Sequence, residues 1–200
     1  QSTLTLTSTS GTYGTTLKLT TSGGSGTGAV SYSTSSAGCS ITNTDSLTVT
    51  GAITCSVTAT KAADSNYNSA SSSATNVVFA TRSITITAAN KSATYTGSTV
   101  SVSNSYTISS GTLVGSDTFT SLTYTYTSAS PSYSSTTAPT AAGTYTITPS
   151  AASGTGSSNY TITYETATLT VSATSQSTLT LTSTSGTYGT TLKLTTSGGS

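Results

Sequence analysis

The chain has 200 residues, of which 43 are serine and 54 are threonine, while charged residues make up 4% and His, Met and Trp are absent. A formal net charge of +1 provides no electrostatic footprint for nucleic acid or an anionic membrane, and no apolar run approaches the ~20 residues of a membrane-spanning helix. Without histidine, no Ser or Cys has the usual general base, so we expect no enzyme activity, no cofactor and no metal site.

The opening segment of the chain is repeated at its end. Residues 1–25 read QSTLTLTSTSGTYGTTLKLTTSGGS, and residues 176–200 read the same. The second copy starts at position 176 instead of 1, which gives a period of 175 residues. An identical return at this distance is typical of a tandem array, seen here as one full period and the beginning of the next.

The first part of the chain alternates apolar and polar residues. Such a period of two places one face of each strand toward a core and the other toward water. A disordered, mucin-like Ser/Thr stalk, the other interpretation of this composition, would have no reason to keep that phase. The alternating sets are Leu4/Leu6, Leu17/Leu19, Val30/Tyr32, Leu47/Val49 and Ile53/Cys55/Val57/Ala59.

Cys39 and Cys55 are the two cysteines of the chain. Zinc ligation is disfavoured because there is no histidine and carboxylates are scarce. A disulfide between Cys39 and Cys55 fits a secreted protein in an oxidising compartment, and the alternative is two free thiols in the core.

The second part of the chain continues the alternation and repeats one feature of the first. Gly51 precedes a strand that is followed by Asn66-Tyr67, and Gly143 precedes a strand that is followed by Asn159-Tyr160. We therefore predict an all-β fold of tandem sandwiches without significant helix: residues 1–81, residues 82–174, and residues 175–200 as the first strands of a further copy of the first domain. The later alternating sets are Ile84/Ile86, Val100/Val102, Leu122/Tyr124/Tyr126, Tyr145/Ile147, Tyr160/Ile162/Tyr164 and Leu169/Val171.

Several stretches resemble known bacterial modules. The first part is similar to bacterial Ig-like repeats of large surface proteins, through TSTSGTYGTTLKLTTSGGSGTGAVSYS, AGCSI and CSVTATKAADSNYNSASS. The second part resembles MBG-type bacterial Ig-like domains, through ATYTGSTVSVS, AAGTYTITPS and SNYTITYETATLTV. The resemblance implies Ig-like β-sandwiches in adhesins or fibres. Calcium at the linkers of such arrays needs clustered carboxylates, and those of this chain are scattered, at Asp45, Asp64, Asp117 and Glu165.

The second part lacks cysteine but is rich in tyrosine. We expect Tyr145 or Tyr160 to make a tyrosine-corner-like hydrogen bond to the backbone, the alternative being plain core packing. The resemblance also raises an intramolecular isopeptide bond. It would join Lys91 to Asn159 (or Asn104) beside Glu165 (or Asp117); otherwise these are solvated surface residues.

The first function that these features predict is structural. One period would extend an extracellular bacterial stalk or fibre at the cell surface, with neighbouring repeats of the same chain as partners. A ligand-binding adhesin module for glycans or surfaces is the second interpretation. The third is a self-assembling filament, because uncharged alternating segments such as STLTLTSTS are templates for pairing with other copies by strand complementation.

Overall fold

The computed structural model describes residues 2–100, 102 and 105–199, and its fold is almost entirely β. Strands account for 48% of the structure, and the described residues form no α-helix, only the 3₁₀ turn η1 (Ser157–Asn159). The predicted all-β sandwich fold is confirmed. In these residues, no helix is long and apolar enough to cross a membrane.

The first sandwich is built from ten short strands. They are β1 (Thr5–Leu6), β2 (Ser10–Thr12), β3 (Leu17–Lys18), β4 (Thr21–Ser22), β5 (Val30–Thr34), β6 (Cys39–Thr42), β7 (Ser46–Val49), β8 (Thr54–Lys61), β9 (Ala70–Ser71) and β10 (Thr75–Ala80). One sheet has the order β2-β10-β8-β5, with β9 also on β8, and faces the sheet β3-β7-β6 and the pair β1-β4. The uncharged segment 2–10 forms no long edge strand, because the chain passes from β1 to β2 and so leaves one sheet for another.

Inward residues of both layers close the core of the first sandwich. Leu4, Leu19, Leu47, Val57 and Phe79 are among the side chains buried there. Each such side chain contributes roughly 1.5–3 kcal/mol on burial before conformational entropy is subtracted.

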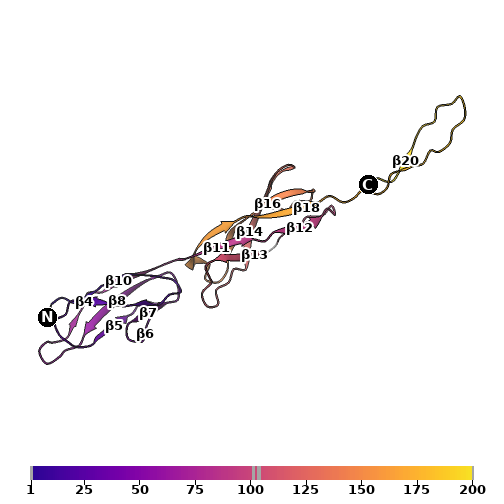
Figure 1. The fold of residues 1–200 in the computed structure, drawn as a ribbon. Helices are drawn as coiled ribbons and strands as arrows, with labels where there is room; N and C mark the ends of the chain where they lie inside the picture. Colours follow the sequence, from indigo (N-terminus) through magenta and orange to yellow (C-terminus); the bar gives the residue numbers. More distant parts are fainter. Residues whose placement is uncertain (1, 101, 103–104, 200) are drawn as a thin grey trace.

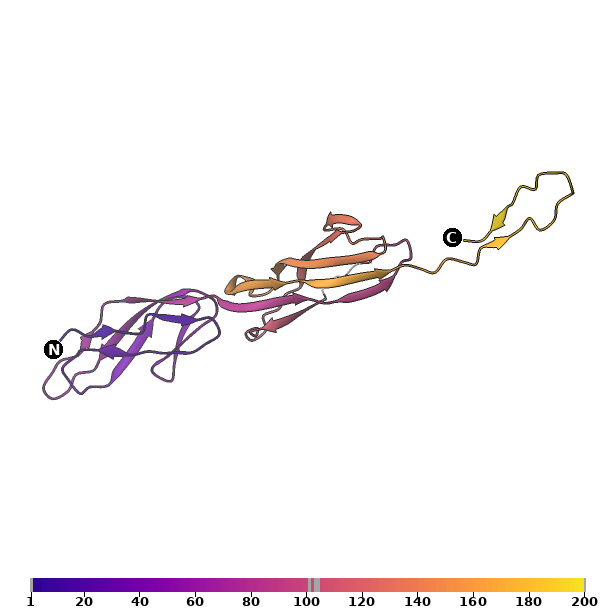
Figure 2. The same ribbon diagram turned by 45° about the horizontal axis from the view of Figure 1, so that its top comes forward.

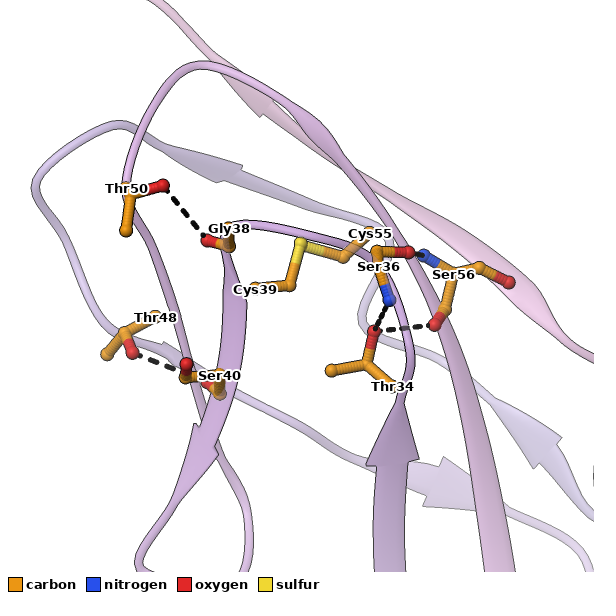
Figure 3. The surroundings of a disulfide bond; sticks show 9 residues. All are labelled: Thr34, Ser36, Gly38, Cys39, Ser40, Thr48, Thr50, Cys55 and Ser56. Atoms are coloured by element: carbon orange, nitrogen blue, oxygen red, sulfur yellow. Dashed lines mark hydrogen bonds between the residues drawn. A yellow bond between two sulfur atoms is a disulfide. The ribbon is translucent and has the colours of Figure 1, made fainter.

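A disulfide joins the two layers of this sandwich (Figure 3). Cys39 at the start of β6 pairs with Cys55 on β8, with a Cα–Cα distance of 6.0 Å. Nearby, the Ser56 N–H donates to Ser36 Oγ at 2.9 Å, and the Thr34 hydroxyl donates to the Ser56 carbonyl at 2.8 Å. The disulfide and these bonds together fix the loop between β5 and β6 against β8.

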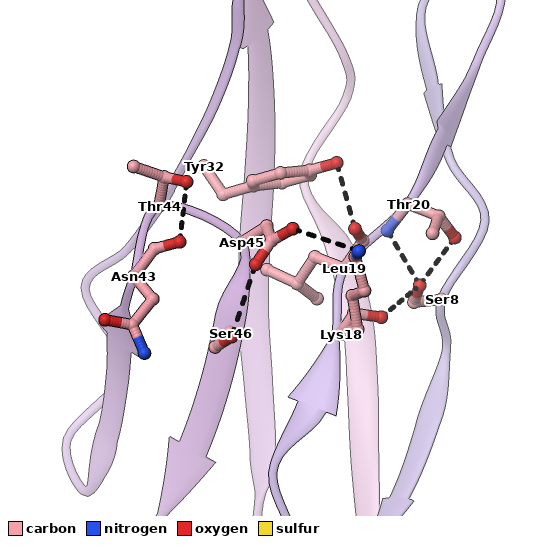
Figure 4. Close-up of polar contacts among 9 residues, drawn as sticks. All are labelled: Ser8, Lys18, Leu19, Thr20, Tyr32, Asn43, Thr44, Asp45 and Ser46. Atoms are coloured by element: carbon pink, nitrogen blue, oxygen red, sulfur yellow. Dashed lines mark hydrogen bonds and ion pairs between the residues drawn. The ribbon is translucent and has the colours of Figure 1, made fainter.

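Polar contacts also hold the opening segment in the first sandwich (Figure 4). The Leu19 N–H donates to the Asp45 carbonyl at 2.7 Å, and the Tyr32 hydroxyl donates to the Leu19 carbonyl at 3.2 Å. The Lys18–Asp45 ion pair, at 3.7 Å, has an exposed lysine and adds little to stability. The backbone of residue 19 is therefore fixed by residues that lie later in the chain.

The second sandwich has longer strands. They are β11 (Arg82–Ala88), β12 (Lys91–Thr94), β13 (Tyr106–Ser110), β14 (Ser121–Ala129), β15 (Ser132–Ser135), β16 (Gly143–Ser153), β17 (Tyr160–Glu165) and β18 (Ala167–Ser172). The sheet β12-β18-β16-β14-β15 packs against the sheet β13-β11-β17. Tyr126, Tyr145, Ile147 and Leu169 are buried in its core, where tyrosine rings provide much of the apolar surface.

Residues 176–199 form a hairpin of β19 (Thr180–Leu181) and β20 (Thr196–Ser197) that repeats the pairing of β1 and β4. Leu181 faces Thr196 as Leu6 faces Thr21 in the first copy. The burial of the two copies differs, however. Leu4 is 2% exposed and its counterpart Leu179 is 62% exposed. The same sequence thus makes its local hydrogen bonds in both places, but only the first copy has a core to enter.

The two sandwiches and the hairpin follow one another along a single elongated direction (Figures 1 and 2). The first sandwich, drawn in indigo and purple, meets the second end to end, and the yellow hairpin extends from the opposite end of the second sandwich. The relative orientation of the two sandwiches therefore depends on the contact between them.

Candidate functional site at the junction of the sandwiches

The covalent link between the two sandwiches is a single residue. β10 ends at Ala80 and β11 begins at Arg82, which leaves Thr81 between them. The Thr81 hydroxyl is hydrogen-bonded to the Thr161 hydroxyl on β17. So short a link brings the ends of the two sandwiches together and favours a fixed orientation over free swinging.

One carboxylate connects the two bodies across this link. Asp117 lies in the loop between β13 and β14, and its Oδ2 accepts hydrogen bonds from two phenols. The Tyr13 hydroxyl of the first sandwich donates to it at 2.9 Å, and the Tyr160 hydroxyl of the second donates at 2.7 Å. Hydrogen bonds to a charged acceptor contribute about 1.5–3 kcal/mol each.

The two phenol rings also pack against each other. Tyr13 and Tyr160 make an edge-to-face contact with ring centroids 5.8 Å apart, and Phe119 makes a second such contact with Tyr160, also at 5.8 Å. These side chains are buried together with Ile84 and Ile86 in an apolar cluster. Edge-to-face pairs add about 0.5–1.5 kcal/mol beyond the area they bury. The junction is therefore a small core shared by both sandwiches.

Backbone geometry allows this close approach. The Tyr13 N–H donates to the Ala80 carbonyl at 2.9 Å, which fixes the ring at the end of the first sandwich. Gly14 follows with φ +79°, and a Cβ added there would lie 2.3 Å from Val114 Cγ2 of the second sandwich. Glycine is required at this position both by its positive φ and by the nearness of Val114.

A further set of bonds closes the other side of the junction. The Asn159 side-chain oxygen accepts the Ala52 N–H of the first sandwich at 3.0 Å. The Tyr160 hydroxyl accepts the Val114 N–H at 2.8 Å while it donates to Asp117. The adjacent residues Asn159 and Tyr160 thus serve the two sides of one contact.

Burial and the neighbouring carboxylate change the acidity of the phenols. Burial, with the hydrogen bond to Asp117, raises the pKa of Tyr160 to about 12, and the same causes raise the pKa of Tyr13. Ionisation would place a second negative charge beside Asp117. Both phenols therefore stay protonated at neutral pH and can donate to Asp117.

The structure also locates the other residues named from the sequence. The predicted disulfide between Cys39 and Cys55 is present. The Tyr145 hydroxyl donates to the Ala141 carbonyl, four residues earlier, at 2.9 Å. Tyr160 makes no such local bond, because its hydroxyl bonds Val114 and Asp117 instead.

The isopeptide hypothesis requires Lys91, Asn159 and Glu165 to be in contact, and the structure separates Asn159 from Glu165. Asn159 lies just before β17 and Glu165 is its last residue, so an extended six-residue strand stands between them. Glu165 accepts a hydrogen bond from the Thr87 hydroxyl at 2.7 Å, while Asn159 bonds the first sandwich. The alternative Asn104 lies outside the described residues.

Residues 84–170 match the family model described as MBG domain (YGX type). The match covers the second sandwich and supports an MBG-type, Ig-like module of the kind found as repeats in bacterial surface proteins. No curated protein matches the chain.

We expect the junction to weaken at alkaline pH. An unfolded chain releases phenol protons near pH 10, whereas folded Tyr160 holds its proton until about pH 12. Its stabilising effect is thus complete below pH 10 and is lost as the pH rises toward and through 12. Urea unfolding at pH 9 and pH 11 should show this loss.

Two single tyrosine-to-phenylalanine variants test this prediction. Tyr160→Phe should reduce the pH dependence, while Tyr188→Phe, whose ring is fully exposed, should leave it unchanged. Equal slopes in the wild type and in Tyr160→Phe would contradict the assignment.

Proposed function

We propose that this chain is one period, with the start of the next, of a long extracellular bacterial stalk or fibre that provides reach and mechanical linkage. Its units would be the sandwiches 1–81 and 82–174, and residues 175–200 would open another copy of the first. The observation that carries the proposal is the junction, where Tyr13, Asp117 and Tyr160 tie two bodies end to end across a one-residue link.

The bonding pattern of the junction suits a load-bearing role. Tension along the chain would have to separate buried rings and charge-assisted hydrogen bonds together with the Asn159–Ala52 contact. The disulfide adds a covalent connection between the layers of the first sandwich and agrees with an oxidising compartment outside the cell. Neighbouring repeats are then the natural partners, and no cofactor is needed.

Electron microscopy of the native material tests this proposal. Thin unbranched threads, whose lengths increase in proportion to the number of 175-residue periods in the chain, would support a stalk. Compact particles, or lengths that increase only with the square root of the number of periods as in a flexible chain, would refute it.

One observation favours a second candidate, a filament joined by strand exchange. The hairpin 176–199 exposes Leu179, Leu181, Leu192 and Leu194, whose identical counterparts lie in the first sandwich. A second chain's hairpin would have to displace residues 4–22 from their own core. A chain of residues 1–175 distinguishes the two, because a monomer that unfolds cooperatively makes strand donation unnecessary, whereas obligate oligomers would favour it.

A further inference from the structure

The first sandwich contacts the second through the end that carries Tyr13. The end of the second sandwich next to the hairpin has the same features at equivalent positions. Thr94 faces Ser172 on parallel strands as Thr12 faces Ala80. The following tyrosine bonds the same carbonyl in each case: Tyr95 N–H to Ser172 at 2.8 Å, and Tyr13 N–H to Ala80 at 2.9 Å. Tyr95 therefore occupies the place of Tyr13, although Tyr95 is 45% exposed and Tyr13 is 5% exposed.

The loop beside each tyrosine is also equivalent. Val171 faces Gly143, and its counterpart Phe79 bonds the Ile53 carbonyl through its N–H. Gly143 therefore corresponds to Ile53. The two residues before each correspond as well, so Ala141 is equivalent to Gly51 and Ala142 to Ala52. Ala52 is the residue that bonds Asn159 across the junction. Tyr95, Ala141, Ala142, Ala173 and Thr174 line an open hollow of about 560 Å³.

The opposite end of the first sandwich carries the matching half. Asn66-Tyr67 lies in the loop between β8 and β9, and Asn159-Tyr160 lies after β16, where Asn159 ends η1 and Tyr160 begins β17. A carboxylate again lies beside this pair: Asp64 Oδ1 accepts the Asn66 N–H at 2.8 Å and the Tyr67 N–H at 2.9 Å. Asp64 Oδ2 accepts the Thr27 N–H at 2.6 Å, which joins the two loops at this end. Tyr67 is 41% exposed.

We propose that the hollow at Tyr95 is the seat for the loop Asp64–Tyr67 of the following copy of the first sandwich. This inference rests on the proposed tandem array and identifies its second kind of junction. The Tyr67 ring would fill the apolar hollow between Tyr95 and the two alanines. The Tyr95 hydroxyl would donate to the carboxylate of Asp64, as Tyr13 donates to Asp117.

The two junctions differ in how closely the neighbouring backbone can approach the tyrosine. At the first junction, Gly14 follows Tyr13 and lets the neighbouring backbone approach closely. At the second, Thr96 follows Tyr95, and Ala173, Thr174 and Ser175 lie between β18 and the repeated segment in place of the single Thr81. The Thr174 hydroxyl donates to the Tyr95 carbonyl at 2.6 Å, so this longer linker is itself held against the hollow. The Tyr67 ring of the following copy would fill the wider space that remains.

A chain of two complete periods tests this seat with tryptophan fluorescence. The natural sequence contains no Trp, so Tyr67→Trp gives a single reporter in either copy. In the second copy, we expect emission at shorter wavelength and weaker acrylamide quenching than in the first, whose Tyr67 lies at the free end. Tyr95→Ala in the first period should abolish the difference, and Val78→Ala, at an exposed residue in the middle of a sheet, should not.

The outcomes separate this inference from the proposed function. Identical emission from the two positions, in a monomer with both disulfides formed, would overturn the seat and leave the stalk intact. A two-period chain that stays compact or exchanges strands would overturn both.

A second reporter avoids dependence on tryptophan. Ala142→Cys in the first period and Asn66→Cys in the second should form a disulfide, seen as a loss of two hydrogens in the intact mass. Failure to form it under oxidising conditions would also contradict the seat.

Discussion

Replacing Tyr160 with alanine is expected to destabilise the second sandwich by about 3–5 kcal/mol, the usual cost of removing a buried aromatic ring. The ring contacts both Tyr13 and Phe119, and its hydroxyl bonds Asp117 and Val114. Its removal also leaves the Val114 N–H without its partner and takes one of two phenol donors from Asp117 Oδ2. Since a small domain is stable by only about 5–15 kcal/mol, much of its stability should be lost.

Urea denaturation of the 200-residue protein measures this effect. The matched control is Tyr95→Ala, which removes the same side chain from an exposed position and should change the unfolding free energy by no more than about 0.5 kcal/mol. Equal losses for Tyr160→Ala and Tyr95→Ala would show that the junction is not a shared core.

The double substitution Cys39→Ala/Cys55→Ala should destabilise the first sandwich by about 2–5 kcal/mol, since a loop of this length contributes ~3 kcal/mol in the chain-entropy model. Cys55 is fully buried, so part of the loss comes from packing. The second sandwich contains no cysteine, and its transition should stay unchanged.

Reduction provides the control for the disulfide. A reducing agent should shift the first transition of the wild type toward that of the double variant and leave the double variant unaffected. A wild type whose first transition is insensitive to complete reduction, with free thiols verified by mass, would contradict a stabilising role.

The fold class was predictable because its signal is local. Alternation at Leu4/Leu6 or Tyr145/Ile147 assigns each residue to a face without knowledge of its partner, and the buried positions follow that phase. The long-range order of the strands is a different matter. Segment 2–12 passes from β1 to β2, which lie in different sheets. The alternation of apolar and polar residues does not reveal this change of sheet.

The junction was beyond prediction because its parts are distant in sequence. Tyr13 and Asp117 are 104 positions apart, and neither residue reveals its partner. Asn159-Tyr160 was visible as a pattern shared with Asn66-Tyr67, but sequence reasoning named Tyr160 only as an alternative to Tyr145 for a backbone bond, and Asn159 as one of two candidates for an isopeptide bond. The signal that was present is Tyr13-Gly14, because a glycine directly after a tyrosine at a strand end indicates close approach of another backbone.

The repeated segment shows how much of its structure depends on context. Thr182 and Thr195 keep the hydroxyl contact that Thr7 and Thr20 make in the first copy. Yet Tyr13 is 5% exposed at the junction, while Tyr188 is fully exposed. Local pairing is thus intrinsic to these 25 residues, whereas burial requires the rest of a sandwich and its neighbour.

The junction is expected to hold the two sandwiches in one orientation, and a distance distribution across it tests this most directly. Spin labels would be placed at Asn76 on β10 and Thr168 on β18, both exposed, through ketone-bearing residues that leave the disulfide intact. Pulsed electron paramagnetic resonance should give a single narrow distance distribution, which Tyr13→Ala broadens. A broad distribution in the unaltered junction, no narrower than in Tyr13→Ala, would contradict the account.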